Sequence, residues 1–110
     1  MKVSEILRAG KQALLDRGWC QGDFEAIHSG SGKCCAATAL IKAEVSTEWI
    51  FDDNNPFNKA MKYLKAAAGL NHPNDSIAAW NDAPERVLAD VLFVYNIAIA
   101  AAEQQEQTNG

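Results

Sequence analysis

Residues 71–85, NHPNDSIAAWNDAPE, end one half of the chain and lead into its most hydrophobic segment. Asp75 and Ser76 stand directly before the apolar Ile77. Their side-chain oxygens can accept backbone N–H groups at a helix start. We therefore expect a short helical turn that begins after Ser76 and ends near Trp80.

The same stretch predicts a second helix start, at Asp82. Asp82 supplies a capping carboxylate, Pro84 suits the first helical turn, and Glu85 lies three residues after the cap. Trp80 and Asn81 then fall at a corner between two helices. An aromatic ring, a carboxamide and a carboxylate should meet at this corner.

The segment after the corner is the most apolar in the chain. From residue 87 to residue 102 only Asp90 and Asn96 are polar. A helix that is apolar nearly all round must be covered nearly all round. In a chain of this length, either the other helices wrap it or part of its surface pairs with a second subunit. We expect this helix to run from Ala83 to about Glu103.

Three helices are predicted before the corner. The first spans residues 4–17 and ends at Gly18, a residue suited to the left-handed C-terminal position. The second spans residues 34–44 and is slim because it is rich in alanine. The third begins at Pro56, which is favoured as a first helical residue, and stops at Gly69.

The predicted fold class is all-α, because no segment shows a convincing strand pattern. The 110 residues allow one core, and a composition of 48% hydrophobic and 22% charged residues is ordinary for a globular domain. We expect a single small domain of four main helices, with a central, nearly all-apolar C-terminal helix and a long glycine-rich loop after helix one, over residues 19–33. The domain spans residues 1–103, and residues 104–110 form a polar C-terminal tail.

Composition also excludes several partner classes. The formal net charge of -4 argues against general nucleic-acid binding, which needs a surplus of Lys and Arg, and against binding to an anionic membrane surface. Residues 87–102 are too few and too polar to span a bilayer. The odd set Cys20, Cys34 and Cys35, with no apolar leader after Met1, predicts a cytoplasmic protein with reduced thiols. No cofactor is predicted.

The loop that enters the second helix is a candidate anion site. Residues 29–34, Ser-Gly-Ser-Gly-Lys-Cys, combine glycines, a helix N-terminus and the cation of Lys33, which together suit a phosphate or carboxylate. The pattern departs from a Walker A loop, because Ile27 stands at the first glycine position and Cys34 follows the lysine. A glycine-serine loop that binds nothing is the alternative interpretation.

A cysteine hydrolase is a further hypothesis. The oxyanion-hole, nucleophile, base and orienting groups of papain-like hydrolases occur here in the same chain order: Gln21, Cys34 or Cys35, His72, and Asn81 or Asp82. Those enzymes place the histidine on a sheet, and this sequence predicts no sheet. Small cysteines that pack a slim helix are the simpler interpretation.

Two other groups have structural interpretations. Cys20 and His28 add potential zinc ligands to the adjacent cysteines, but the chain has no CxxC pair, so no metal site is predicted. Lys59, Lys62 and Lys65 follow one face of the third helix. We interpret this row as a solvated helix face.

Three segments together resemble a small family of uncharacterised proteins from actinobacteria and their phages. The segments are Trp19-Cys20-Gln21-Gly22, Cys35-Ala36-Ala37-Thr38-Ala39-Leu40, and His72-Pro73 followed by Ser76-Ile77-Ala78-Ala79-Trp80-Asn81-Asp82. The chain departs from the family pattern at Thr38, where glycine is usual, and by the extra Asn74 and Asp75. The resemblance implies a similar fold and a phage or bacterial setting, but no reaction. It also implies one constellation of residues: Gln21, Cys35, Trp80, Asn81 and Asp82.

The leading functional hypothesis is a non-enzymatic small binding protein, a phage accessory or anti-defence factor that captures a small anionic, nucleotide-like ligand or a host protein. Its expected ligand-binding residues are Gln21, Lys33, Cys35, Trp80, Asn81 and Asp82. Lys33 would hold the anion, Trp80 would stack, and Asn81 would contact an edge of the ligand. The alternatives are a protein–protein inhibitor with an acidic surface at Asp52 and Asp53, and the cysteine hydrolase. A homodimer is kept as an alternative to a monomer.

Overall fold

The structure is a computed structural model that describes residues 2–21, 33–41, 56–72 and 74–109. Within these ranges the chain forms five helices: α1 (Val3–Arg17), α3 (Ala36–Ile41), α4 (Pro56–Ala67), α5 (Ile77–Asn81) and α6 (Leu88–Asn109). The β pairing within the same ranges is a single isolated parallel bridge between Trp19 and Cys34. The all-α prediction is confirmed. Most of the glycine-rich loop and the acidic pair Asp52 and Asp53 lie outside the described residues.

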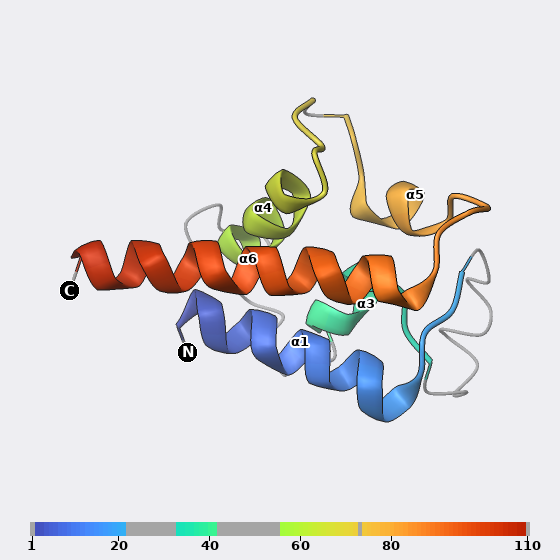
Figure 1. Cartoon of the computed structure of the whole chain (residues 1–110), viewed down its shortest axis with the longest axis horizontal. Coiled ribbons are helices and arrows are strands. Elements are labelled where there is room, and N and C mark those ends of the chain that lie inside the picture. The colour runs from blue at the N-terminus through green and yellow to red at the C-terminus, as the bar shows by residue number, and fades with distance from the viewer. Residues whose placement is uncertain (1, 22–32, 42–55, 73, 110) are drawn as a thin grey trace.

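Helix α6 is the longest element, and it lies across the front of the molecule with α1 antiparallel beside it (Figure 1). Helix α4 packs against both α1 and α6, so these three helices contact one another in every pair. Helix α3 packs on α1, and α5 packs on α3. Both chain ends lie at one end of the bundle, and α5 lies toward the other (Figure 1).

Several helix ends follow the predicted local signals. Pro56 is the first residue of α4, and the Ser76 side chain caps α5 by accepting the backbone N–H of Ala79 at 3.0 Å. Gly18 and Gly69, which follow α1 and α4, have positive φ values of 92° and 79°. Glycine adopts such values at little cost, which explains why the helices end there.

The start of the last helix differs from the prediction. Helix α6 begins at Leu88 rather than Ala83, and Asp82 is the C-terminal cap of α5. The acid that caps α6 is Asp90, whose Oδ2 accepts the backbone N–H of Val87 at 3.1 Å. The prediction is wrong because both aspartates offer the same capping chemistry, and only the later one stands in the first turn of the continuous helix.

The core centres on Tyr95, which is fully buried on α6. Its hydroxyl donates to the backbone oxygen of Ala36 at 2.7 Å. Burial raises the pKa of Tyr95 well above its usual value, so the hydroxyl remains a donor at neutral pH. Fully buried aliphatic side chains from four helices belong to the same core: Ile6, Leu7, Leu40, Leu64, Val91 and Ala98.

Gly10 allows α1 to approach this core closely. A Cβ atom at Gly10 would lie 2.9 Å from Cδ2 of Leu40 and 3.0 Å from Cε1 of Tyr95. Both distances are shorter than ordinary contacts between carbon atoms. The apolar face of α1 therefore needs glycine at this position.

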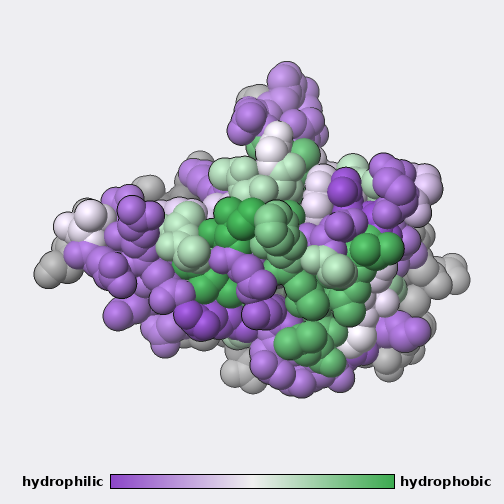
Figure 2. Space-filling model, in the orientation of Figure 1, coloured by the Kyte–Doolittle hydropathy of each residue, from purple (hydrophilic) through white to green (hydrophobic). Residues whose placement is uncertain are grey.

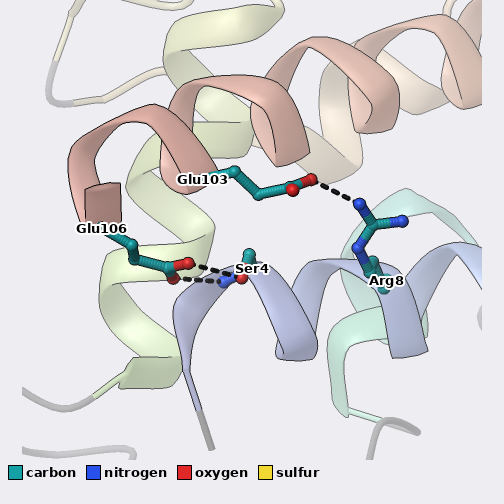
Figure 3. A network of polar contacts seen from close by, with 4 residues as sticks. All are labelled: Ser4, Arg8, Glu103 and Glu106. Atoms are coloured by element: carbon teal, nitrogen blue, oxygen red, sulfur yellow. Dashed lines mark hydrogen bonds and ion pairs between the residues drawn. The ribbon is translucent and has the colours of Figure 1, made fainter. Parts of the chain in front are cut away.

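A polar network joins α1 to the end of α6 (Figure 3). The carboxylate of Glu106 accepts the Ser4 backbone N–H at 3.1 Å and the Ser4 hydroxyl at 2.7 Å. One turn further along both helices, Arg8 pairs with Glu103. These contacts explain why α6 continues to Asn109 instead of ending near Glu103 as predicted, since Glu106 caps the N-terminus of α1.

We expect Gly10→Ala to destabilise the protein by about 1–3 kcal/mol, although alanine is the better helix former. The Tyr95 ring cannot retreat without losing its hydrogen bond to Ala36. Urea unfolding of the variant and the wild type measures the difference. Leu40→Ala removes the nearer contact, so Gly10→Ala should cost much less in that background. A stabilising effect of Gly10→Ala in the wild-type background would contradict the prediction.

Glu106→Gln should give a pH-dependent loss of stability. The hydrogen bonds from the Ser4 hydroxyl and backbone, with the nearby Lys2 charge, lower the pKa of Glu106. A carboxyl whose pKa is lower in the folded state adds stability above its unfolded pKa and loses it as the pH falls through its folded pKa. The stability difference between wild type and variant should therefore be largest near about pH 7 and shrink toward about pH 3. Denaturant titrations across this range check it, and a difference independent of pH would refute it.

Candidate functional site

Asn81, the last residue of α5, holds the predicted corner together. Its Oδ1 accepts the indole N–H of Trp19 at 2.6 Å and the backbone N–H of Ala36 at 2.9 Å. Its Nδ2 donates to the backbone oxygen of Cys20 at 3.0 Å and to Oδ1 of Asp82 at 3.1 Å. The residue is 0% exposed, and a buried amide is stable only when its polar atoms are paired in this way. One carboxamide thus joins the end of α1, the start of α3 and the corner.

Two long side chains hold the backbone around Asn81. Gln21 donates through Nε2 to the backbone oxygens of Asn81 and Ala83, both at 2.8 Å. Arg86 donates through Nε to the backbone oxygen of Trp80 at 3.0 Å, and its guanidinium lies 4.0 Å from the centre of the Trp80 ring. This stacking is a cation–π contact. The corner is therefore fixed from the α1 side and from the α6 side.

Cys35 caps α3 from inside the same cluster. Its sulfur lies 3.5 Å from the backbone nitrogen of Thr38, and the Thr38 hydroxyl accepts the backbone N–H of Cys35 at 2.9 Å. This is a reciprocal arrangement like a capping box, with a thiol in place of a hydroxyl. The backbone N–H groups at the N-terminus of α3 therefore have acceptors within the protein: the Thr38 hydroxyl for Cys35, Oδ1 of Asn81 for Ala36, and the Cys35 sulfur for Thr38.

The structure brings most of the predicted constellation together. Gln21, Asn81 and Asp82 are joined by hydrogen bonds to one another or to shared backbone, with Trp80 beside them, and Cys35 lies next to Ala36 in the same cluster. Lys33 is exposed at the edge, where the chain enters α3. The observed contacts position the chain. A ligand-binding role for these six residues stays a prediction.

The described residues show no catalytic pairing for the hydrolase hypothesis. The Cys35 sulfur is engaged within its own turn, and Cys34 is 0% exposed. His72 accepts the backbone N–H of Asn74 through Nδ1 at 3.1 Å, while Gln21 donates to backbone oxygens instead of facing a reaction centre. The same parts of the chain contain no group of three or more side chains placed to hold a metal ion. Nor does any helix described here have the length and apolar character needed to cross a membrane.

A second feature is an uncovered apolar face on α6, here called the α6 face: Ala89, Phe93, Asn96, Ile97 and Ala100, all exposed. Their spacing of three and four residues places them on one side of the helix. Phe93 is 65% exposed and Ile97 41%. Figure 2 shows hydrophobic surface over α6 on the viewed side of the molecule. The sequence allowed two arrangements for this helix: cover by the other helices, or pairing of part of its surface with a second subunit. In the part of the chain that the structure describes, the other helices leave this side of α6 uncovered.

A third feature, interpreted from the sequence only as a solvated face, is a groove beside α4. Lys59 and Lys62 line a cavity of about 670 Å³ together with Lys2, which comes from the other end of the sequence. The sequence shows the lysine row on α4, but it does not show that Lys2 lies beside that row in the folded chain. This proximity depends on how α1 and α4 pack, so no local pattern could have shown it.

The chain belongs to DUF6197, a family of unknown function, whose profile matches residues 1–101. The resemblance to an uncharacterised family is therefore confirmed. None of the curated proteins and none of the solved structures compared with the chain gives a significant match. The matched region contains the α6 face and the residues here called the Asn81 cluster: Gln21, Cys35, Trp80, Asn81 and Asp82. It ends before Glu103 and Glu106.

Asn81→Ala should destabilise the protein by about 2–4 kcal/mol, because the buried N–H of Ala36 and the part-buried groups of Trp19 and Cys20 lose their bonds to this amide. Thermal and urea unfolding measure the loss. Asn71→Ala is the matched control, since Asn71 is exposed and its substitution should change stability by less than about 0.5 kcal/mol. Equal effects of the two substitutions would show that Asn81 does not hold the corner.

Proposed function

We propose that this chain is a non-enzymatic binding protein whose partner is another protein, held by the α6 face. The observation that carries the proposal is the exposure of Phe93 and Ile97 on a helix whose opposite side forms the core. Apolar side chains grouped on one surface of a small domain mark contact surfaces more often than isolated exposed residues do.

The energetics favour contact with an apolar partner. Burying the exposed part of a Phe or Ile side chain contributes about 1–2 kcal/mol. The five residues of the α6 face carry no charge, and Asn96 is the polar one; Asp90, three residues before Phe93, is engaged in capping Val87. Depletion of charge at the centre of a patch is typical of interface cores, because an unpaired charge is costly to desolvate.

An exposed ion pair lies near one end of this face, where Glu103 stands three residues after Ala100. Arg8 and Glu103 form an exposed ion pair where α1 runs beside α6, with 61% and 39% of their side chains accessible. Exposed ion pairs of this kind contribute little to folding, but at the border of an interface they can set orientation and association rate. An apolar centre with a charged border is the arrangement found in many protein–protein interfaces.

The proposal keeps one arm of the sequence hypothesis, capture of a protein, and it places the contact on α6. Inhibition through an acidic surface would use Asp52 and Asp53, which lie outside the described residues. No observed geometry favours the cysteine hydrolase over binding. The phage setting suggested by the resemblance remains a prediction about where such a partner would occur.

The test is photo-crosslinking from within the interface. A benzoylphenylalanine replaces Phe93 in one variant and the exposed Ala66 of α4 in a matched control, each expressed in the native host. Irradiation should give a discrete adduct with a second protein from position 93 and none from position 66. With that protein purified, Phe93→Asp should weaken binding about a hundredfold, as expected for a central interface aromatic.

Two outcomes would overturn the proposal. Adducts that contain only a second copy of this chain would make the α6 face a dimer interface instead of a partner site. Absence of any adduct at position 93 beyond the control would show that the face is not used. Circular dichroism of each variant checks that the fold is intact.

A further inference from the structure

The groove beside α4 shares no residue with the α6 face and has the size of a small-molecule site. Its volume is about 670 Å³, within the range of about 300–1,000 Å³ usual for ligand pockets. Val3, Tyr63 and Ala102 give it an apolar lining from three helices, α1, α4 and α6. Tyr63 is half-buried and packs against the core, so its position is fixed.

Three ammonium groups surround this apolar lining. Lys59 and Lys62 stand one turn apart on α4, and Lys2 approaches from the N-terminal side of α1; all three are exposed. Lysine ammonium groups are mobile point charges that suit phosphate oxygens. Three lysines around one groove carry three positive charges. This suits a ligand with several negative charges, such as a phosphate or diphosphate, better than a single carboxylate.

The acidic residue on the groove wall, Glu106, cancels only part of this charge. Both oxygens of Glu106 accept hydrogen bonds from Ser4, one from the backbone and one from the hydroxyl. The hydrogen bonds from Ser4 lower the pKa of Glu106, with a smaller contribution from the Lys2 charge, and among the described residues Glu106 is the one carboxylate in the groove lining. Among the described lining residues, three positive charges against one negative give +2, in a chain whose formal net charge is -4.

We infer that this groove binds a small aromatic phosphate of the nucleotide class. Lys2, Lys59 and Lys62 hold the phosphates, Tyr63 packs against the planar ring, and the carboxamide of Gln105 on the groove wall offers a donor and an acceptor to the ring edge. The inference stands independently of the α6 face, because it uses none of the same residues.

The charge pattern favours a small ligand over a nucleic-acid strand. A strand must cross the protein surface beyond the groove, and the net negative charge of the chain repels its further phosphates. A nucleoside diphosphate places its whole charge within reach of the three lysines. Binding should therefore weaken with added salt but should not grow with the length of the polyanion.

Titration calorimetry and amide NMR with ADP provide the test. ADP should bind and shift resonances at Lys59, Lys62 and Tyr63. The double variant Lys59→Ala/Lys62→Ala should weaken binding at least tenfold. Lys62→Ala alone should also weaken binding, and Lys65→Ala is its matched control, since it removes one charge from the same helix outside the groove lining and should change affinity less than twofold. Tyr63→Leu keeps an apolar side chain and should weaken ADP about tenfold while leaving inorganic phosphate unchanged.

Each contrary result is distinct. No binding of ADP at millimolar concentration, or equal effects of Lys62→Ala and Lys65→Ala, would overturn the site. Tighter binding of octyl phosphate than of ADP would overturn the aromatic part of the inference. Affinity for oligothymidylate that rises with strand length would replace the small ligand with a nucleic acid. Unfolding curves of each variant separate loss of binding from loss of structure.

Discussion

The side-chain amide of Asn81 is the contact on which the arrangement of the helices depends. It is short and fully buried, yet it ties its own corner to two segments that are far from it in the sequence: the chain after α1 and the start of α3. Hydrophobic packing can hold α1, α4 and α6 together without it, because those helices share the core. Leu40 of α3 and Ile77 of α5 also enter this core, but apolar contacts are non-directional and do not by themselves fix how these short helices are oriented. A directional, desolvated amide does so, because any other placement leaves buried donors unsatisfied.

This constraint explains why the corner and the cysteine segment act as one unit. The first N–H groups of a helix lack partners within that helix, and a six-residue helix such as α3 has few internal bonds to offset the loss. Asn81 and the Cys35–Thr38 pair satisfy donors at that end. The thiol therefore has a structural reason to stand there, in keeping with its burial, and the asparagine has a reason to follow Trp80 that requires no ligand.

The sequence predicts the elements of this fold better than their limits and their contacts. Periodicity and the glycines after α1 and α4 locate those helices, because local chemistry determines their ends. The sequence predicts the start of α6 at Ala83, before the observed Leu88, because Asp82 and Asp90 are both possible capping residues and tertiary packing decides which of them caps the helix. The residues of the Asn81 cluster were grouped through a family pattern, but the pattern does not say that the amide is turned inward. Its burial depends on contacts across 45 to 62 positions of the chain.

The polar side chains of the predicted constellation bond to the protein itself, so the candidate binding surfaces are the α6 face and the groove beside α4. A domain of this size has little spare apolar material, and leaving Phe93 exposed carries a solubility cost that a partner would remove. Collecting Lys2, Lys59 and Lys62 around one groove likewise costs repulsion between like charges, which a bound anion would relieve. Neither cost benefits folding. Because the two surfaces share no residue, a ligand in the groove and a protein on α6 can be bound at the same time, with α6 as the element that both contact.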